Sequence, residues 1–410
     1  MTDQPNSTCK ISLANVKKLF FEMGPIRPPS EGADHSLLLR VVRNCPWNKC
    51  LFCGTYKKEK FGYRSAEEIK EDIDVAKALY DEIKAASWRL GLAGKVTSEL
   101  VQAIAYGNPE IYAQGDGLPL QNLVNVANWT ASGGRTVFLQ DADAIIMRTP
   151  ELVEVLEYVK KTFPTIKRVT SYARAKTCNR KPLEDLQRLH QAGLSRLHVG
   201  LESGNDEVLA FMQKGVTREE HIAGGKKIVK SGISLSEYYM PGLGGRKWSK
   251  AHAVDSAKAL SEIDADFIRM RSLIVKKGTL LYEAQIEGKF EQLSEDEMVN
   301  EIALFIENLN CHSYIISDQM SNLLFEVEGQ LPDKKADILE RISNYQQKPP
   351  TKKLEFRLKR RLQSYIGVYG SLDQDLNQSI TEAMNAIQSE SPDAQDKTNQ
   401  AIAALKQGFV

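Results

Sequence analysis

Three cysteines lie close together in the first part of the chain, at Cys45, Cys50 and Cys53, in the spacing C-x4-C-x2-C. They follow Ser36–Val42, an apolar run that predicts a buried strand, so we expect them on a loop at the end of that strand. Three thiolates can bind three irons of a cuboidal iron–sulfur cluster and leave the fourth iron without a protein ligand. An open iron of this kind allows a cluster to do chemistry on a small molecule.

A structural zinc site, completed by a distant cysteine or histidine, is the main alternative for this loop. Such zinc sites usually combine two paired C-x2-C or Cys/His units, whereas this sequence has one C-x2-C pair and no matching second cluster. The place of the loop in the predicted fold favours the iron–sulfur interpretation. The other cysteines are isolated, which is typical of small buried side chains: Cys9, Cys178 and Cys311.

The composition is that of a globular protein, with 42% hydrophobic and 26% charged residues among 410. A formal net charge of +1 gives no general field that would attract nucleic acid or a membrane. No apolar run approaches the roughly 18 residues of a membrane span, and the N-terminus does not resemble a secretory signal. Few and clustered cysteines suit a reducing compartment, so we expect a cytoplasmic protein with no membrane partner.

Short apolar runs alternate with segments of helical periodicity between residues 36 and 275. The predicted strands cover residues 36–42, 135–139, 167–171, 196–200, 233–239 and 266–272. Helix starts are marked by capping boxes at Ser65–Glu68 and Thr217–Glu220, and by Thr149 as an N-cap before Pro150. This alternation predicts an α/β fold with parallel strands and right-handed crossovers, here a partial (β/α)6 barrel similar to a TIM barrel.

The chain divides into three parts on this basis. Residues 1–35 form a lead-in with a short helix, residues 36–275 form the core, and residues 276–410 form a mainly helical C-terminal region. Residues 83–134 interrupt the alternation of the core with glycines and short apolar patches. We interpret them as an insertion and as a candidate lid.

Polar or glycine-containing segments follow all six predicted strands. In chain order they are the cysteine loop, Gln140–Asp143, Ser171–Arg174, Gly200–Gly204, Met240–Gly245 and Arg269–Ser272. Active sites of barrels of this type lie at the C-terminal ends of the strands, so we expect these segments at one rim. Together they predict a cup of polar groups around a metal loop.

These features resemble the radical S-adenosylmethionine (radical SAM) superfamily over roughly residues 36–275. The most similar branch contains the oxygen-independent coproporphyrinogen oxidases and the elongator-type and methylthiotransferase proteins. Phe52, before the last cysteine, and the strand end Gly200–Gly204 carry that likeness. The common spacing in the superfamily is C-x3-C-x2-C, so the present loop has one extra residue before its second cysteine. Gln140–Asp143 stands where Gly-Gly-Glu is usual.

The resemblance implies that Cys45, Cys50 and Cys53 bind a 4Fe–4S cluster and that S-adenosylmethionine (SAM) chelates its open iron. An electron, supplied by a donor such as flavodoxin or ferredoxin, would cleave the sulfonium bond and give a 5′-deoxyadenosyl radical that abstracts a hydrogen atom from the substrate. The protein would then be a radical SAM enzyme, an oxidoreductase or transferase, that orients its substrate and excludes water. We expect a small-molecule substrate, which the sequence does not identify.

The resemblance also implies that Asp141 or Asp143 would take the methionine amino group of SAM. On physical grounds, Arg174 would pair with the carboxylate of SAM. Glu202 and Ser203 would hydrogen-bond the ribose or the methionine end. The full predicted cofactor-binding set is Phe52, Asp141, Asp143, Ser171, Arg174, Glu202, Ser203, Gly242, Gly244 and Arg271.

Several of these residues have equally simple structural interpretations. Phe52 would lie against the adenine, and Gly242 and Gly244 would let the backbone approach it, but glycines at such spacing also make turns. The two aspartates could cap helices or be solvated. Arg269 and Arg271 share one face of a strand and either line the cup or form a surface pair.

Two other functions remain open from the sequence. Lys348–Arg361 holds seven Lys or Arg and one Glu, which is usually a solvated helix face and less often a binding site for tRNA or another polyanion. A tRNA-modifying radical SAM enzyme is therefore one alternative. The altered cysteine spacing and the missing Gly-Gly-Glu suggest the other, an iron–sulfur binding or electron-carrier protein without SAM chemistry.

Overall fold

The structure is a computed structural model that describes residues 20–29, 35–109, 111 and 117–409. The predicted lead-in helix lies almost wholly outside these ranges, so its prediction stays open. Within the described ranges, no helix is both long enough and apolar enough to cross a bilayer.

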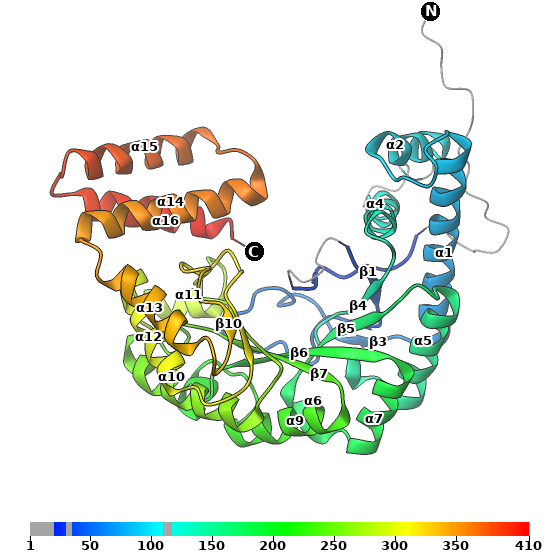
Figure 1. Ribbon diagram of the computed structural model, residues 1–410, viewed down its shortest axis with the longest axis horizontal. Helices are drawn as coiled ribbons and strands as arrows, with labels where there is room; N and C mark the ends of the chain where they lie inside the picture. Colours follow the sequence, from blue (N-terminus) through cyan, green and yellow to red (C-terminus); the bar gives the residue numbers. More distant parts are fainter. Residues whose placement is uncertain (1–19, 30–34, 110, 112–116, 410) are drawn as a thin grey trace, which may run out of the picture. The chain divides into compact units, whose positions relative to one another are not determined.

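The main sheet has eight strands (Figure 1). Its strands, in the order in which they lie side by side, are β1 (Leu37–Arg40), β4 (Thr136–Gln140), β5 (Arg168–Ala173), β6 (Leu194–Glu202), β7 (Ser234–Tyr239), β8 (Phe267–Met270), β9 (Tyr314–Ile316) and β10 (Gly329–Gln330). Leu37, Leu38 and Leu39 of β1 are all buried, as expected for a parallel strand that is covered on both faces.

The strand order follows the chain order, which is the winding of a (β/α) barrel rather than of a doubly wound sheet. The registers of β1 through β6 and of β7 through β9 are parallel, and β10 is antiparallel to β9. The predicted α/β fold, a partial (β/α)6 barrel, is confirmed, and all six predicted strands are present. The prediction missed β9 and β10, which extend the sheet within a region expected to be mainly helical.

Helices follow most of the strands. They are α1 (Ala66–Arg89), α2 (Ser98–Gly107), α4 (Leu118–Ala131), α5 (Thr149–Thr162), α6 (Ala175–Arg180), α7 (Leu183–Ala192), α8 (Asp206–Phe211), α9 (Arg218–Ser231), α10 (Gly245–Ile263), α11 (Leu280–Ile286), α12 (Glu295–Asn308), α13 (Lys335–Gln346), α14 (Pro350–Tyr369), α15 (Gln374–Gln388) and α16 (Ala394–Gln407). Both predicted capping boxes form. The predicted start of α5 was one residue late, because Arg148 is the N-cap and Thr149 is already helical.

Close packing divides the chain into two units, and the first contains the described parts of residues 1–48, 55–199 and 227–235. Trp129 of α4 is fully buried in this unit, and its ring packs edge-to-face on Phe163 at 4.9 Å. Asn125 of α4 accepts the backbone N–H of Leu38 at 3.1 Å, so this helix satisfies part of the open edge of β1.

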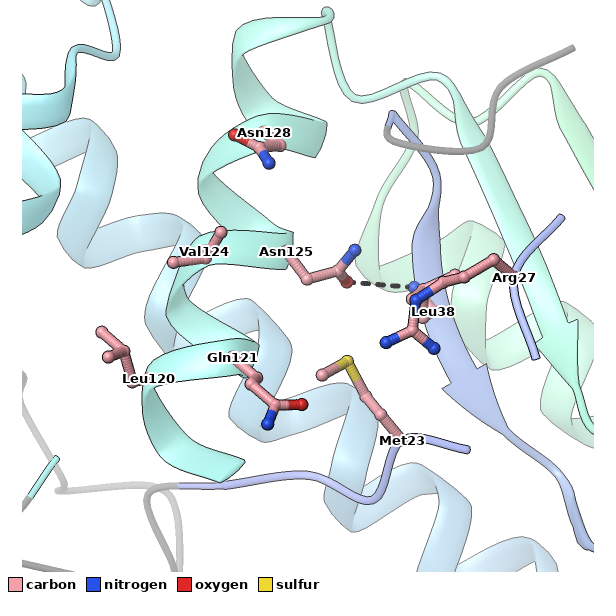
Figure 2. Close-up of a pocket in the computed structure, with 8 residues that line it drawn as sticks. All are labelled: Met23, Arg27, Leu38, Leu120, Gln121, Val124, Asn125 and Asn128. Atoms are coloured by element: carbon pink, nitrogen blue, oxygen red, sulfur yellow. Dashed lines mark hydrogen bonds between the residues drawn. The ribbon is translucent and has the colours of Figure 1, made fainter. Parts of the chain in front are cut away.

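A pocket of about 350 Å³ lies beside the same helix (Figure 2). Its lining residues are Met23, Arg27, Leu38, Leu120, Gln121, Val124, Asn125 and Asn128. They include no thiol and no carboxylate, so the pocket offers none of the predicted cluster ligands.

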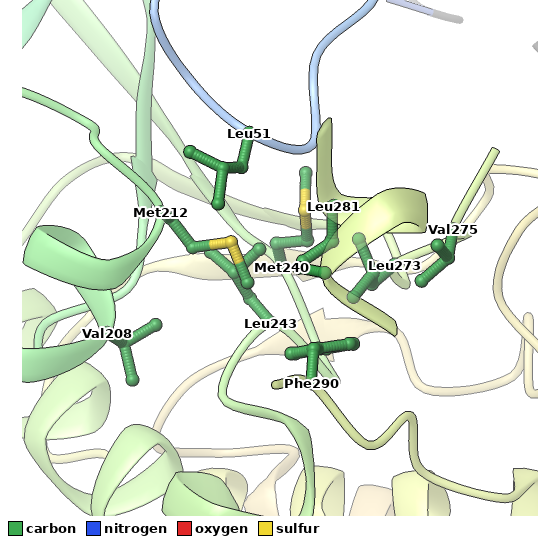
Figure 3. Close-up of a cluster of buried hydrophobic side chains, with 10 residues drawn as sticks. Leu51, Val208, Met212, Met240, Leu243, Leu273, Val275, Leu281 and Phe290 are labelled. Carbon is green, nitrogen blue, oxygen red and sulfur yellow. The ribbon is translucent and has the colours of Figure 1, made fainter. Parts of the chain in front are cut away.

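The second unit contains residues 49–54, 200–226 and 236–410. One of its buried apolar clusters includes Leu51 of the cysteine loop together with Leu273, Val275 and Leu281 (Figure 3). Another is formed by α14, α15 and α16, which lie side by side (Figure 1).

Candidate active site

The cysteine loop joins β2 (Val42–Arg43) to β3 (Gly62–Tyr63), two short strands that pair antiparallel. Asn44 begins the loop with a φ of 67°, a left-handed conformation that asparagine adopts more readily than most residues. Its side-chain amide donates a hydrogen bond to the carbonyl oxygen of Lys60 at 2.6 Å. The first residue of the loop is therefore bonded to the far end of the loop.

The three loop cysteines are half-buried and form no disulfide, whereas Cys178 and Cys311 are buried. The Sγ atom of Cys45 accepts the backbone N–H of Asn48 at 3.4 Å, and hydrogen bonds to sulfur are one means by which proteins tune iron–sulfur clusters. No three His, Cys, Asp or Glu side chains of the described ranges are gathered into a metal site. The donor set fits a three-thiolate cluster in number, type and accessibility, although the thiols are not gathered in this structure.

Asp141, which follows β4, holds the start of the cysteine loop. Its carboxylate is fully buried, and Oδ2 accepts the backbone N–H of Asn44 at 3.0 Å and the Nε–H of Arg40 at 2.7 Å. Arg40 also bonds to the side-chain oxygen of Asn44 at 2.8 Å. This anchoring contact was not predicted from the sequence, and the predicted contact of Asp141 with the SAM amino group stays a prediction.

Asp143 is fully buried and connects to the start of α6. It accepts the hydroxyl of Thr177 at 2.5 Å and the backbone N–H of Arg174 at 3.3 Å. Burial raises the pKa of Asp143 to about 6, although the Thr177 hydroxyl and Arg174 oppose the rise. The Arg174 guanidinium lies 5.3 Å from the ring centroid of Trp47, a cation–π contact with the cysteine loop.

Ser171 is also buried and donates its hydroxyl to the carbonyl oxygen of Leu139 at 2.8 Å.

Glu202 and Phe52 are brought together through Lys214, which the sequence analysis did not single out. The ammonium of Lys214 is 3.1 Å from Oε1 of Glu202 and 5.8 Å from the ring centroid of Phe52. Glu202 has a φ of 63°, and its side chain lies over Gly200, where an added Cβ would come within 2.2 Å of Oε1. One of 54 Lys and Arg residues in the chain, Lys214 had no sequence signal that distinguished it.

Ser203 and the two predicted glycines occupy structural positions in the second unit. The Ser203 hydroxyl is buried and hydrogen-bonded to Nδ1 of His252 at 2.8 Å. Gly242 has a φ of 85° and donates its N–H to Glu301 at 2.6 Å. A Cβ on Gly244 would come within 2.9 Å of the His252 side chain. The turn interpretation thus has direct support, and the predicted contacts of these residues with ribose and adenine stay predictions.

Glu237, in the middle of β7, was also missed by the sequence analysis. Its side chain is fully buried, and neither carboxyl oxygen has a hydrogen-bond partner among the described residues. Burial, with a further contribution from the charge of Glu202, raises the pKa of Glu237 well above its usual value. A buried polar group without a partner is uncommon and often marks a functional position.

The two arginines near the end of β8 differ in their surroundings. Arg269 is buried and its guanidinium lies 3.4 Å from the carboxylate of Asp318. Arg271, just beyond the strand, is exposed, and its backbone N–H donates to the carbonyl oxygen of Tyr239 at 3.0 Å.

The basic run Lys348–Arg361 begins two residues before α14 and continues into it, and all seven of its cations have partners within the second unit. The contacts are Lys348 with the Phe356 ring, Lys353 with the Tyr345 ring, Lys352 and Lys359 with Glu355, Arg357 with Asp296, Arg360 with Glu326 and Arg361 with Glu295. Cations that already contact a carboxylate or an aromatic ring are less available to neutralise phosphates, so the run is a weak candidate for tRNA binding.

Residues 107–257 match the radical SAM superfamily. The chain contains a radical SAM domain. The matched segment covers β4 through β7 and begins after the cysteine loop, so the loop itself is not part of the match. The predicted resemblance is confirmed, and the two predicted cofactors, a 4Fe–4S cluster and SAM, are those that radical SAM enzymes bind.

Curated proteins of Methanocaldococcus species are similar to part of this chain. An uncharacterized protein of Methanocaldococcus jannaschii is 26% identical over 125 residues, which are 30% of this chain and 38% of that protein. A tRNA uridine(34) acetyltransferase of the same organism is 26% identical over 132 residues, which are 31% of this chain and 23% of the relative. The chain therefore spans less than two fifths of the length of either relative.

Solved structures of radical SAM proteins are also similar to this chain. They include Elp3 of Methanocaldococcus infernus (16% identity, 44% of this chain and 46% of that one, TM-score 0.37) and the coproporphyrinogen III oxidase HemN of Escherichia coli (15%, 42% and 40%, TM-score 0.35). The hydrogenase maturase HydG aligns over 90% of this chain and 76% of its own, with 12% identity and a TM-score of 0.38.

Proposed function

We propose that the protein is a radical SAM enzyme whose Cys45, Cys50 and Cys53 hold a 4Fe–4S cluster with one iron left open for SAM. The observation that carries the proposal is the presence of three accessible thiols, none in a disulfide, on one loop of a radical SAM protein. When bound, the cluster and SAM supply one-electron cleavage of SAM and abstraction of a hydrogen atom from the substrate. Such chemistry suits a cytoplasmic enzyme in a reducing compartment.

The chain's own residues would position these groups. Asp141 fixes the residue before the first cysteine, and the Asn48 N–H donates to Cys45. Lys214 holds its charge beside Phe52 while paired with Glu202. These contacts are fixed by buried or half-buried partners, which favours a loop that is oriented by the protein and shielded from water.

The test is anaerobic reconstitution of the full chain with iron and sulfide, followed by reduction with SAM present. We expect 5′-deoxyadenosine as a product and iron–sulfur absorbance that is lost in Cys45→Ala, Cys50→Ala and Cys53→Ala. The buried Cys178→Ala serves as the matched control and should keep both. A fully loaded protein that forms no 5′-deoxyadenosine would contradict SAM cleavage and favour an iron–sulfur protein without SAM chemistry.

A small molecule is the substrate class that we favour, with modification of tRNA as the second candidate. The tRNA candidate is supported by the 26% identity with a tRNA uridine(34) acetyltransferase, whereas the pairing of the basic run argues against that run as a binding surface. Filter binding of bulk tRNA at physiological salt separates the two. Retention with micromolar or tighter affinity would favour tRNA, and its absence a small molecule.

A further inference from the structure

The segment that leaves β8 carries two cations without counter-ions. Arg271 is exposed and Lys276 is half-buried. Among the described residues, neither the Arg271 guanidinium nor the Lys276 ammonium has a hydrogen-bond or ion-pair partner. By contrast, Arg269 and Lys214 of the same unit each lie beside a carboxylate.

The backbone at Arg271 is nevertheless firmly held. Its N–H donates to the carbonyl oxygen of Tyr239 at 3.0 Å. The next residue, Ser272, donates both its N–H and its hydroxyl to Oδ1 of Asn322, each at 2.9 Å. The guanidinium therefore extends from a fixed point of the chain.

The backbone at Lys276 is held in a similar way by the last helix. The side-chain amide of Gln407 in α16 accepts the N–H of Lys277 and donates to the carbonyl oxygen of Val275, both at 3.4 Å. Thr279 donates its hydroxyl to the carbonyl oxygen of Lys276 at 2.7 Å. Contacts on both sides of Lys276 thus fix its backbone and leave its ammonium unpartnered.

This segment lies against the part of the cysteine loop that carries Cys50 and Cys53. Leu281 donates its N–H to the carbonyl oxygen of Leu51 at 3.1 Å. The methyl group of Thr279 would be 3.5 Å from a Cβ added to Gly54. Figure 3 shows Leu51 in the same buried cluster as Leu273 and Val275, which lie between the two cations in the sequence.

The positive charges of Arg271 and Lys276 interact unfavourably, and no anion among the described residues pairs with either of them. Burial, together with the charge of Arg271, lowers the pKa of Lys276. A bound anion would offset both effects, and a carboxylate or a phosphate would match the planar fork of an arginine.

We propose that Arg271 and Lys276 form an anion-binding subsite, beside the cysteine loop, for a carboxylate or phosphate group of the reacting ligands. The identity of those ligands rests on the proposed function, but the binding of an anion does not. The group could belong to the methionine end of SAM or to the substrate, and the experiment below distinguishes these sources.

The probe is pyridoxal 5′-phosphate, applied to the full chain without its cluster. Its aldehyde condenses with the unprotonated amine of Lys276 and releases water, while its phosphate binds Arg271. Borohydride then delivers hydride to the imine carbon, which fixes the adduct as a secondary amine for peptide mass spectrometry. We expect Lys276 to react about tenfold faster than the neighbouring exposed Lys277, because a charge-assisted contact is typically worth about a factor of ten or more.

Three comparisons make the test specific. Pyridoxal, which lacks the phosphate, should show a clearly smaller preference for Lys276, because only the lowered pKa of Lys276 then favours it. Inorganic phosphate should protect Lys276 from the phosphorylated probe. Arg271→Gln should remove the difference between the two probes, whereas Arg148→Gln, a change of an exposed arginine in the other unit, should keep that difference. The same preference for Lys276 with both probes, or an unchanged difference between the probes in Arg271→Gln, would overturn the proposal.

Two further arms identify the source of the anion. With cluster-loaded protein, the same labelling is repeated in the presence of SAM. Protection by SAM assigns the subsite to the cofactor carboxylate, and protection by phosphate but not by SAM assigns it to the substrate. Labelling of the cluster-free chain is independent of SAM cleavage, so failure of the proposed function and failure of the subsite give different results.

Discussion

Oδ2 of Asp141 accepts the backbone N–H of Asn44 at 3.0 Å, one residue before the first cysteine of the loop. The two residues are 97 positions apart in the sequence, and the carboxylate is fully buried. The end of β4 therefore fixes the start of the cysteine loop through a single charged group. Arg40, at the end of β1, bonds to the same oxygen.

Asp141→Asn should weaken both the fold and the cofactor site. The neutral amide loses the charge-assisted bonds to Arg40 and Asn44, so we expect the free energy of unfolding to fall by roughly 3 kcal/mol. Iron content after reconstitution should fall with it. Urea unfolding and iron analysis measure the two effects. The control Asp81→Asn, which breaks an exposed ion pair, should change the free energy of unfolding by less than about 0.5 kcal/mol. An Asp141→Asn protein that keeps the wild-type free energy of unfolding and the wild-type iron content would refute the anchoring role of Asp141.

The titration of Asp143 should make the free energy of unfolding depend on pH in the mildly acidic range. Its pKa of about 6 in the folded protein lies above the value of about 3.9 in an unfolded chain, so the folded state binds the proton more tightly. Its contribution to stability should therefore be fully present below about pH 4 and decline up to about pH 6, by roughly 3 kcal/mol in total. Asp143→Asn removes this titration. Denaturant titrations between pH 4 and 7 should show that the free energy of unfolding of Asp143→Asn increases relative to that of the wild type as pH rises. If the difference between the two proteins does not change with pH, Asp143 does not have a raised pKa.

Replacement of Glu237 by methionine should stabilise the protein at neutral pH. The change removes a buried carboxyl that lacks a partner and keeps a similar volume, so we expect a gain of roughly 1–3 kcal/mol in the free energy of unfolding. Because the folded pKa of Glu237 is raised, the gain should shrink as pH falls toward the unfolded value of about 4.3. Glu237→Gln provides the isosteric control. A loss of stability at pH 7 in the methionine variant would show that the carboxyl makes a favourable contact.

Glu295 should be a main link between α12 and the C-terminal helices. It pairs with Arg361 at 2.6 Å and Lys406 at 3.1 Å. Burial alone would raise the pKa of Glu295, but these two cations outweigh it and lower the pKa to about 2. This stabilisation is present above about pH 4.3 and is lost as pH falls toward 2.

Glu295→Gln should therefore lower the free energy of unfolding by roughly 3 kcal/mol at pH 7, because Arg361 and Lys406 are largely buried and would lose their anionic partner. Hydrogen exchange of α14 and α16 should increase more than that of α10. The control Glu355→Gln, which removes a surface partner of Lys352 and Lys359, should leave exchange of these helices unchanged. If hydrogen exchange of α14 and α16 is the same in Glu295→Gln and Glu355→Gln, Glu295 is not a main link between α12 and these helices.

The sequence predicted the six main strands because each is an apolar run long enough to identify. β9 has three residues and β10 has two, too few for a periodicity, and their pairing depends on neighbours far along the chain. The site was predicted less completely for the same reason. Thiol spacing is local and visible, whereas the bond between Asp141 and Asn44, and the contact of Lys214 with Phe52, join distant segments. A buried glutamate in a strand such as Glu237 has no local pattern that separates it from a solvent-facing one.

Gly24 lies on the other side of the Asp141 carboxyl and has no functional group of its own. A Cβ at this position would come within 1.9 Å of Oδ1 of Asp141, and the backbone N–H and carbonyl oxygen of Gly24 are both bonded to Gln140. In a random screen for colonies that lose the cofactor-dependent phenotype, changes at Gly24 should consequently be recovered alongside changes at the cysteines. Such a screen would thus identify Gly24, which has no side chain that could bind a cofactor, as a residue that the cofactor site requires.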